Sequence, residues 1–205
     1  MILKVHPITP DQRLIGKAVD RLVAGGVIIY PTDTVYGIGC SIKDKSAIER
    51  VYLIKRQRNK SPFSFVCADL KNISEYAHVS NFAFKIMKRL IPGPYTFILP
   101  AARMKQLPKL LVSKRKTVGI RVPDNPITLA LVRGLGGPIL STSVTTADGE
   151  ILNDVEEISS LFGNQVDIII DGGAKTTEPS TVLDLTGEDP IVLREGSGDL
   201  EVIGY

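Results

Sequence analysis

The sequence predicts an α/β fold in which helices are interspersed among the strands of a mixed sheet. Capped helical patterns alternate with short apolar strand patterns along the 205 residues. Several strand patterns near the end follow one another through tight links, which predicts antiparallel pairs beside parallel ones. No low-complexity linker interrupts the chain, so we expect a single domain over residues 1–205.

The first helix is expected to begin at Thr9 and Pro10, because a hydroxyl can cap free backbone N–H groups and proline suits the first turn. Apolar residues follow at helical spacing, and Gly25 with Gly26 ends the helix. The apolar run over residues 27–30 comes directly after these glycines. We interpret it as a buried strand.

Four more helices are predicted by the same signals. Asp44 caps a second helix that leads to Lys55, and Ser80 caps a third that stops before the proline-glycine turn at residues 92–94. Asn125 starts a fourth helix, to about Leu135, and a fifth lies near residues 155–162. The remaining strands are predicted at residues 63–67, 95–99, 117–122, 138–143, 166–170, 180–185 and 191–195.

The charge is divided unevenly along the chain. Residues 1–146 carry 23 basic and 8 acidic side chains, or +15, whereas residues 147–205 carry 2 and 14, or −12. This division produces a strong dipole if the two parts occupy different faces. Alternatively, the acidic part neutralises the basic part within the fold, and the sequence favours neither arrangement.

Several classes of protein are disfavoured by composition. No apolar run approaches the ~20 residues that span a bilayer, and no secretory leader follows Met1, so we expect a cytoplasmic protein without a membrane partner. Cys40 and Cys67, with only two histidines elsewhere, match no zinc spacing. We interpret both cysteines as buried and reduced.

Hydroxyl side chains gather where predicted strands begin or end. The segment PTDTVYG at residues 31–37 follows a buried strand with two threonines and a carboxylate, LSTS at residues 140–143 ends another strand, and EPST at residues 178–181 enters a third. Each segment alone is also typical of a polar turn.

Basic side chains accompany these hydroxyls. Lys55 lies on the same side of the second helix as its buried apolar residues, so a charge there needs a partner. Alternatively, favourable interaction with the helix C-terminus explains one or two of the charges in KRQRNK, residues 55–60. Arg121 and Arg194 lie within strand patterns and need anionic partners if buried. Together, the hydroxyls and cations predict a pocket for a phosphate or a carboxylate.

Seven segments resemble the YrdC/YciO family in order and spacing, over nearly the whole chain. They are PTDTVYGIG, PGPYTFIL, TVGIRVPDNP, PILSTS, VDIIIDGG, STVLDL and VLREG, which start at residues 31, 92, 117, 138, 166, 180 and 192. Characterised members make threonylcarbamoyl-adenylate from L-threonine, bicarbonate and ATP for tRNA modification. The resemblance implies a twisted, open mixed sheet of the YrdC/RibB type, with a positively charged concave face.

The resemblance is closest to the YciO branch because two positions depart from the synthase pattern. Gln57 stands where synthases have the arginine of Lys-x-Arg, and Thr145 stands where they have the asparagine of Ser-x-Asn. Both changes remove donors from the expected ATP site. Arg58 is the residue that could replace the missing guanidinium.

The family's site residues carry over to ten positions. By resemblance, Thr32 contacts threonine, Lys55 and Arg58 the phosphates or carboxylate, Ser141 and Ser143 the nucleotide, Thr117 and Arg121 the cleft floor, Ser180 and Thr181 substrate oxygens, and Arg194 the nucleotide. The implied reaction is adenylyl transfer that releases pyrophosphate. It needs charge neutralisation more than a protein nucleophile, so no catalytic residue is assigned. Magnesium is expected to arrive with ATP, without a dedicated metal site or a tightly bound cofactor.

The rival hypothesis is a module that binds tRNA or other double-stranded RNA with little synthase activity. The +15 part of the chain supplies phosphate contacts, and a concave face recognises a duplex by its shape. The two functions are compatible with each other. The expected RNA contacts are Arg56, Lys60, Lys114, Arg115 and Lys116.

Overall fold

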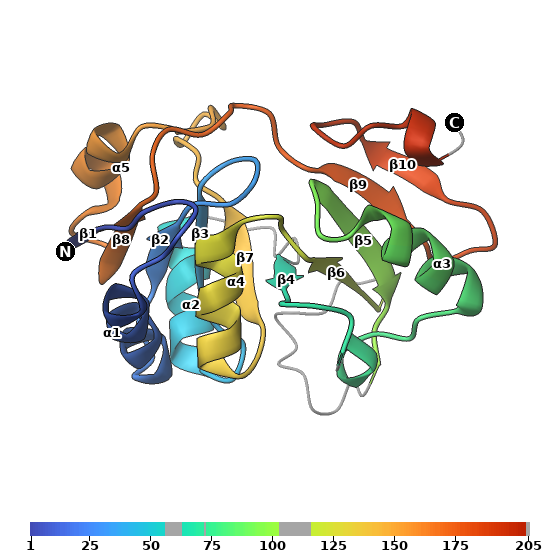
Figure 1. Cartoon of the computed structure of the whole chain (residues 1–205), viewed down its shortest axis with the longest axis horizontal. Coiled ribbons are helices and arrows are strands. Elements are labelled where there is room, and N and C mark those ends of the chain that lie inside the picture. The colour runs from blue at the N-terminus through green and yellow to red at the C-terminus, as the bar shows by residue number, and fades with distance from the viewer. Residues whose placement is uncertain (56–62, 72, 103–115, 204–205) are drawn as a thin grey trace.

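The computed structural model describes residues 1–55, 63–71, 73–102 and 116–203. Within these ranges, ten strands form one sheet in the order β1-β8-β2-β3-β7-β4-β6-β5-β9-β10, and five α-helices pack around it (Figure 1). The mixed α/β fold predicted from the sequence is confirmed. The strands are β1 (Ile2–Lys4), β2 (Ile28–Tyr30), β3 (Gly37–Ser41), β4 (Ser64–Val66), β5 (Tyr95–Pro100), β6 (Thr117–Arg121), β7 (Ile139–Ser143), β8 (Ile168–Asp171), β9 (Thr181–Asp184) and β10 (Ile191–Arg194).

The helices follow the predicted pattern of caps. They are α1 (Gln12–Val23), α2 (Lys45–Ile54), α3 (Asn81–Leu90), α4 (Pro126–Leu135) and α5 (Val155–Phe162), with short 3-10 helices at Ile73–Glu75 and Glu201–Ile203. The predicted caps of α2, α3 and α4 are confirmed, because Asp44, Ser80 and Asn125 each accept a hydrogen bond from a backbone N–H in the first turn.

The predicted start of α1 is wrong by two residues. The cap is Asp11, whose carboxylate accepts hydrogen bonds from Arg13 N at 2.8 Å and Leu14 N at 3.2 Å. The Thr9 hydroxyl lies 3.0 Å from Nδ1 of His6 instead. The carboxylate of Asp11, two residues after Thr9, is therefore the cap in place of the threonine hydroxyl.

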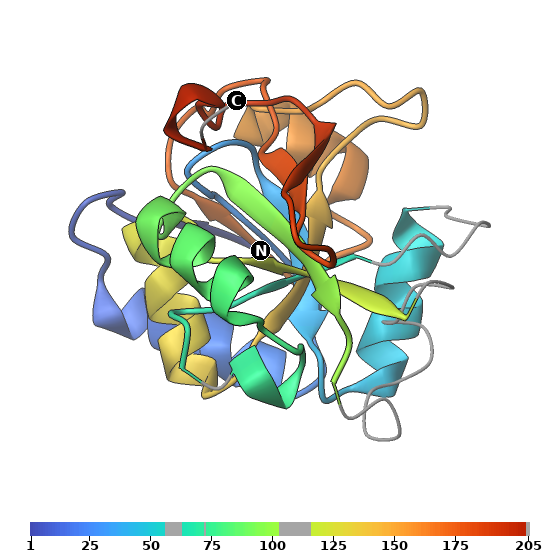
Figure 2. The ribbon, with the colours of Figure 1, turned by 90° about the vertical axis from the view of Figure 1, so that its right-hand side faces the viewer.

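Strand β2 shows why its sequence is apolar throughout. Ile29 belongs to one hydrophobic cluster with α2, whereas Ile28 and Tyr30 belong to the other, with α1 and α4. Figure 2 places α2 on one side of the sheet and α1 with α4 on the other. Because neighbouring strand residues point to opposite faces, both faces of this strand are buried.

Two strands were not predicted from the sequence. β3 contains two glycines in five residues and pairs antiparallel with both β2 and β7. A side chain at Gly39 would collide with the backbone oxygen of Leu140 in β7, so the close pairing itself requires glycine. β1 has three residues at the edge of the sheet and pairs with β8 in parallel.

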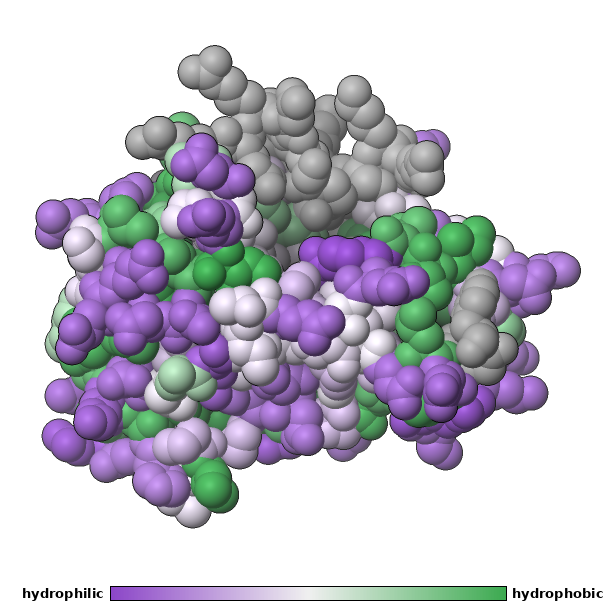
Figure 3. Space-filling model, turned by 90° about the horizontal axis from the view of Figure 1, so that it is seen from above, coloured by the Kyte–Doolittle hydropathy of each residue, from purple (hydrophilic) through white to green (hydrophobic). Residues whose placement is uncertain are grey.

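The acidic residues 147–205 contribute α5, β8, β9 and β10, and the connection from β8 to β9 crosses the top of the molecule in Figure 1. This upper face is largely hydrophilic, with apolar side chains in separate patches (Figure 3). Asp167 from this part pairs with Arg21 and Arg50 from the basic part. Neutralisation within the fold therefore occurs at this point.

Two further predictions can be compared with the structure. Cys40 and Cys67 are buried free cysteines, and burial raises the pKa of each thiol to about 12. Among the residues that the structure describes, no helix is long and apolar enough to cross a bilayer.

Candidate functional site

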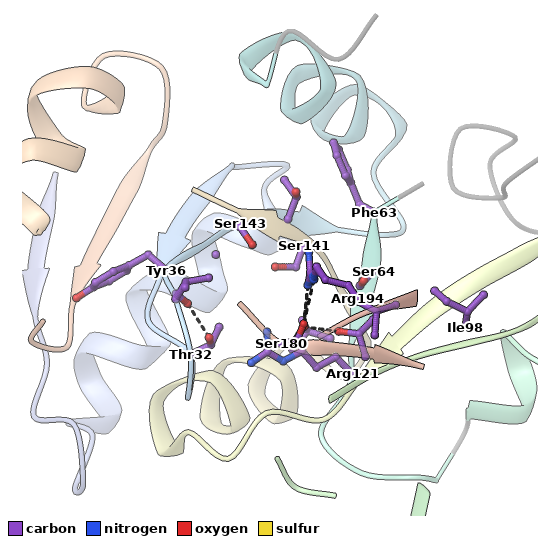
Figure 4. Close-up of a pocket in the computed structure, with 16 residues that line it drawn as sticks. Thr32, Tyr36, Phe63, Ser64, Ile98, Arg121, Ser141, Ser143, Ser180 and Arg194 are labelled. Carbon is purple, nitrogen blue, oxygen red and sulfur yellow. Dashed lines mark hydrogen bonds between the residues drawn. The ribbon is translucent and has the colours of Figure 1, made fainter. Parts of the chain in front are cut away.

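A cavity of about 260 Å³ opens where strands from the two halves of the sheet meet. Figure 4 shows side chains from the turn after β2 and from β4, β6, β7 and β10 directed around it. Its polar lining consists of Thr32, Tyr36, Ser64, Thr96, Arg121, Ser141, Thr142, Ser143, Ser180 and Arg194. Two of these residues are arginines, and none of the described lining residues is an aspartate or glutamate. The cavity therefore favours an anionic ligand with several oxygen atoms.

Arg121 at the end of β6 has its anionic partner in Asp33. The Nη2 atom of Arg121 lies 2.6 Å from Oδ1 of Asp33 and 2.8 Å from Oγ1 of Thr34. Both charged side chains are only 10% exposed. The buried arginine that the sequence left without a partner is thus paired with a carboxylate in the turn after β2.

The turn at residues 31–35 is held by its own hydroxyl and by α4. Thr32 donates from Oγ1 to the Val35 carbonyl at 2.6 Å and accepts from Thr34 N at 3.2 Å. Asn125 donates to the carbonyl of Thr32, and Thr128 donates to the carbonyl of Pro31. These bonds fix the backbone that carries the partners of Arg121.

Two serines that line the cavity are supported from behind. Tyr30 is fully buried and donates to Oγ of Ser141 at 2.7 Å, and burial raises the pKa of this tyrosine. Because the Ser141 oxygen accepts this bond, its own proton is free to be donated. The hydroxyl oxygen of Ser180 lies 2.9 Å from the hydroxyl oxygen of Thr96, so these two side chains share a hydrogen bond.

Arg194 on β10 is exposed and lies beside Ser180. Its Nε and Nη2 atoms donate to the Ser180 carbonyl at 3.1 and 2.8 Å. Partial burial and the nearby charge of Arg121 lower the pKa of Arg194. The two guanidinium groups are thus close enough to repel each other, and an anion bound between them would stabilise both charges.

Lys55 lies at the C-terminus of α2, where its inward direction was predicted. Its Nζ atom donates to Oγ1 of Thr145 at 2.6 Å, two residues beyond Ser143 on the chain that leaves β7. Burial lowers the pKa of Lys55 to about 8. The described residues offer this ammonium a hydroxyl but no carboxylate within ion-pair distance, so an anion would complete its surroundings.

Six of the ten predicted site residues line the cavity: Thr32, Arg121, Ser141, Ser143, Ser180 and Arg194. Lys55 is not part of the lining. Its hydrogen bond to Thr145 places its ammonium beside the chain that leaves β7. Thr117 is at the opposite end of β6 from Arg121 and is not part of the lining. Arg58 lies outside the described residues.

The predicted ligand contact of Thr181 does not agree with the geometry. Its Oγ1 donates to the Gly198 carbonyl at 2.9 Å and accepts from Gly196 N and Gly198 N. Since adjacent strand residues face opposite ways, Ser180 and Val182 turn toward the cavity and Thr181 turns away from it. Thr181 therefore holds the C-terminal turn.

The predicted RNA surface falls mostly outside the described residues. Arg56, Lys60, Lys114 and Arg115 all lie there, as does Gln57. Lys116 is described and exposed, and it directly precedes β6. The RNA hypothesis thus stays a prediction.

Sequence reasoning did not assign two charged residues near the site. Asp33 pairs with Arg121, and Lys175 lies close enough to Asp33 for the carboxylate to favour its charged form, although burial lowers the pKa of Lys175 overall. A signal was present in the sequence. Lys175 and Arg194 are the two basic residues of the acidic part; Arg194 lines the cavity, and Lys175 interacts with Asp33.

Comparison with known proteins identifies relatives along nearly the whole chain. The family model Sua5/YciO/YrdC, described as telomere recombination, matches residues 20–196. The uncharacterized protein YciO of Escherichia coli (strain K12) is 48% identical over 199 residues, or 96% of each chain. The crystal structure of E. coli YciO matches with a TM-score of 0.93 and 45% identity, over 99% of this chain and 98% of that one.

Two further relatives have names or ligands that bear on activity. The threonylcarbamoyl-AMP synthase of Vibrio vulnificus (strain YJ016) is 30% identical over 184 residues, which cover 88% of this chain and 97% of that protein. The crystal structure of P. abyssi Sua5 complexed with L-threonine matches with a TM-score of 0.92 and 28% identity. That match covers 100% of this chain and 61% of the Sua5 chain.

Proposed function

This chain belongs to the Sua5/YciO/YrdC family, and from that premise we propose that it forms threonylcarbamoyl-adenylate from L-threonine, bicarbonate and ATP. The observation that carries the proposal is the charge of the cavity, whose described lining holds two arginines, several hydroxyls and no carboxylate. Threonine carboxylate, bicarbonate and triphosphate are all anions with multiple oxygen acceptors. The relative that binds L-threonine has the same fold.

The size of the cavity suggests how these ligands are divided. At about 260 Å³ it lies just below the ~300–1,000 Å³ of typical small-molecule pockets. We therefore place the threonylcarbamate end inside the cavity, beside Thr32 and Arg121. The nucleotide extends from Ser143 toward Lys55, where the partly buried ammonium awaits an anion.

The chemistry assigned to these residues is neutralisation of charge. In the proposed reaction, the threonine amine first combines with bicarbonate to form a carbamate, with loss of water. An oxygen of this carbamate group then attacks the α-phosphorus of ATP, and the bond from that phosphorus to the bridging oxygen of the β-phosphate breaks to release pyrophosphate. Lys55 and Arg194 stabilise the negative charge that gathers on the leaving group, while Arg121 holds the threonylcarbamate end. Magnesium is proposed to enter as the counter-ion of ATP.

The proposed product belongs to tRNA modification, which agrees with a cytoplasmic location where ATP and tRNA are both present. Thr145 does not abolish the site in this proposal. Its hydroxyl accepts a hydrogen bond from Lys55 and so keeps the ammonium beside the end of β7. Asn at this position would offer the same lysine an amide oxygen.

Pyrophosphate release tests this proposal directly. The purified full-length protein should release pyrophosphate with ATP, L-threonine and bicarbonate together, and mass spectrometry should detect threonylcarbamoyl-adenylate. Omission of either threonine or bicarbonate should abolish the release. Arg194→Ala should slow it by about 10-fold or more, the loss expected for one charge-assisted contact.

A matched variant separates the site from general effects of losing an arginine. Arg89 also donates to a backbone carbonyl, that of Val202, but lies on α3 away from the cavity lining. Arg89→Ala should therefore leave the rate unchanged. Pyrophosphate release that ignores threonine, or an equal loss in both variants, would contradict the proposal.

A further inference from the structure

Two atoms of the Asp33–Arg121 pair are buried without a hydrogen-bond partner in the part of the chain that the structure describes. They are Oδ2 of Asp33 and Nε of Arg121. Such groups are uncommon in folded proteins because losing water without gaining a partner is unfavourable. Their presence beside a cavity indicates that the pair is arranged for more than its own stability.

The bonds of this pair hold only one end of the guanidinium group. Nη2 of Arg121 donates to both Asp33 and Thr34. A guanidinium carries five N–H donors in a rigid plane, so fixing Nη2 fixes the direction of the rest. The remaining donors belong to a side chain that lines the cavity.

The support behind Asp33 is itself rigid. The Thr32 hydroxyl closes the turn, and Asn125 and Thr128 at the start of α4 bind its carbonyl groups. Asp33 therefore does not need to be ordered when a ligand arrives. A preset anchor of this kind spares the ligand the entropic cost of orienting the arginine.

We propose that Asp33 is a positioning residue, which acts through Arg121 by fixing the guanidinium group in the orientation that serves an anion in the cavity. This inference rests on the proposed function for the identity of the anion. The contact with the ligand belongs to Arg121, whereas Asp33 itself is not part of the cavity lining. Lys175 lies in the field of the same carboxylate.

The sign of one change in affinity distinguishes positioning from simple electrostatics. Asp33→Asn removes a negative charge beside the cavity, so the electric field alone would strengthen the binding of an anion. Loss of the anchor would weaken it. We expect threonylcarbamoyl-adenylate, whose threonylcarbamate end is placed beside Arg121, to bind about 10-fold more weakly to Asp33→Asn when binding is measured by calorimetry. In the Arg121→Lys background, the same substitution should have little further effect.

A direct measurement of Arg121 makes the test independent of catalysis. In the ¹⁵N-labelled protein, the Nε–H signal of Arg121 should be sharp and exchange slowly with water. In Asp33→Asn it should broaden or exchange about 10-fold faster. If the natural protein releases no pyrophosphate, the proposed function fails, but this comparison still decides whether Asp33 positions the arginine.

Asp167→Asn is the matched control, because Asp167 is a similarly buried carboxylate that pairs with arginines away from the cavity. It should change neither the Arg121 signal nor the affinity for threonylcarbamoyl-adenylate. Asp33→Glu keeps the charge and provides a second variant if Asp33→Asn does not fold; its Arg121 signal should again be perturbed. An unchanged Arg121 signal in the folded Asp33 variant, or stronger binding of threonylcarbamoyl-adenylate, would overturn the proposal.

Discussion

Raising the pH should reveal Lys55 as part of the proposed ATP site. Burial lowers the pKa of its ammonium to about 8 in the unliganded protein, whereas contact with phosphate favours the charged form. From pH 7 to pH 9 the charged fraction of the free site falls about 10-fold, and the affinity for ATP should fall with it. Because Lys55 is partly exposed, solvent screening reduces this to between several-fold and about 10-fold.

Lys55→Arg is the matched control because a guanidinium stays charged over the whole interval. Calorimetry of both proteins at constant ionic strength gives the ratio of their affinities at each pH. The titration of ATP itself cancels in that ratio. If the two proteins lose affinity in parallel between pH 7 and pH 9, Lys55 does not supply the titrating charge and the reasoning is refuted.

Four other changes have expected outcomes. Burial alone would raise the pKa of Asp167, but hydrogen bonds from Val27 N and two arginines lower it. Asp167→Asn should therefore lower the free energy of unfolding in urea by about 2 kcal/mol at pH 7. The loss should shrink as pH falls below 3.8 and the native carboxylate takes up a proton. A constant cost would contradict this. Gly39→Ala should lower the free energy of unfolding by about 1–3 kcal/mol because of its backbone collision, whereas Gly16→Ala, with open space around it, should raise it by about 0.5–1 kcal/mol; equal effects would be inconsistent with the β3–β7 packing. Gln57→Arg combined with Thr145→Asn should accelerate pyrophosphate release, unless Arg58 already occupies the position, which Arg58→Ala in both backgrounds would reveal. For RNA binding, reversing Lys114, Arg115 and Lys116 to Glu should flatten the slope of log affinity against log salt concentration. An unchanged slope would exclude this surface.

The helices were predictable because their signals are local. Asp44, Ser80 and Asn125 each lie within one turn of the N–H group that they cap, so neighbouring residues suffice to identify the helix. The error at α1 arose where two candidate caps stand two residues apart. There the carboxylate of Asp11 caps the helix, and the Thr9 hydroxyl lies beside His6.

The missed strands depend on contacts far along the chain. The glycines of β3 read as turn residues until β7 is placed beside them, about a hundred residues later. The same limit applies to the site. Cations and hydroxyls were predictable by type, and six candidates do surround one cavity. The direction of Thr181 and the pairing of Asp33 with Arg121 required the register of the sheet and the path of the turn.

The position of β8 has a consequence for how the chain folds. This strand lies between β1 and β2 and pairs in parallel with both, although about 140 residues separate β2 from it. A growing chain that ends before Ile168 therefore leaves Ile28 and Ile29 along an open edge. Parallel pairing over such a separation is slow because a long loop must close first. The part of the sheet formed by β1, β8 and β2 is thus completed only after most of the protein has been synthesised, and until then its unpaired apolar edge is prone to aggregation.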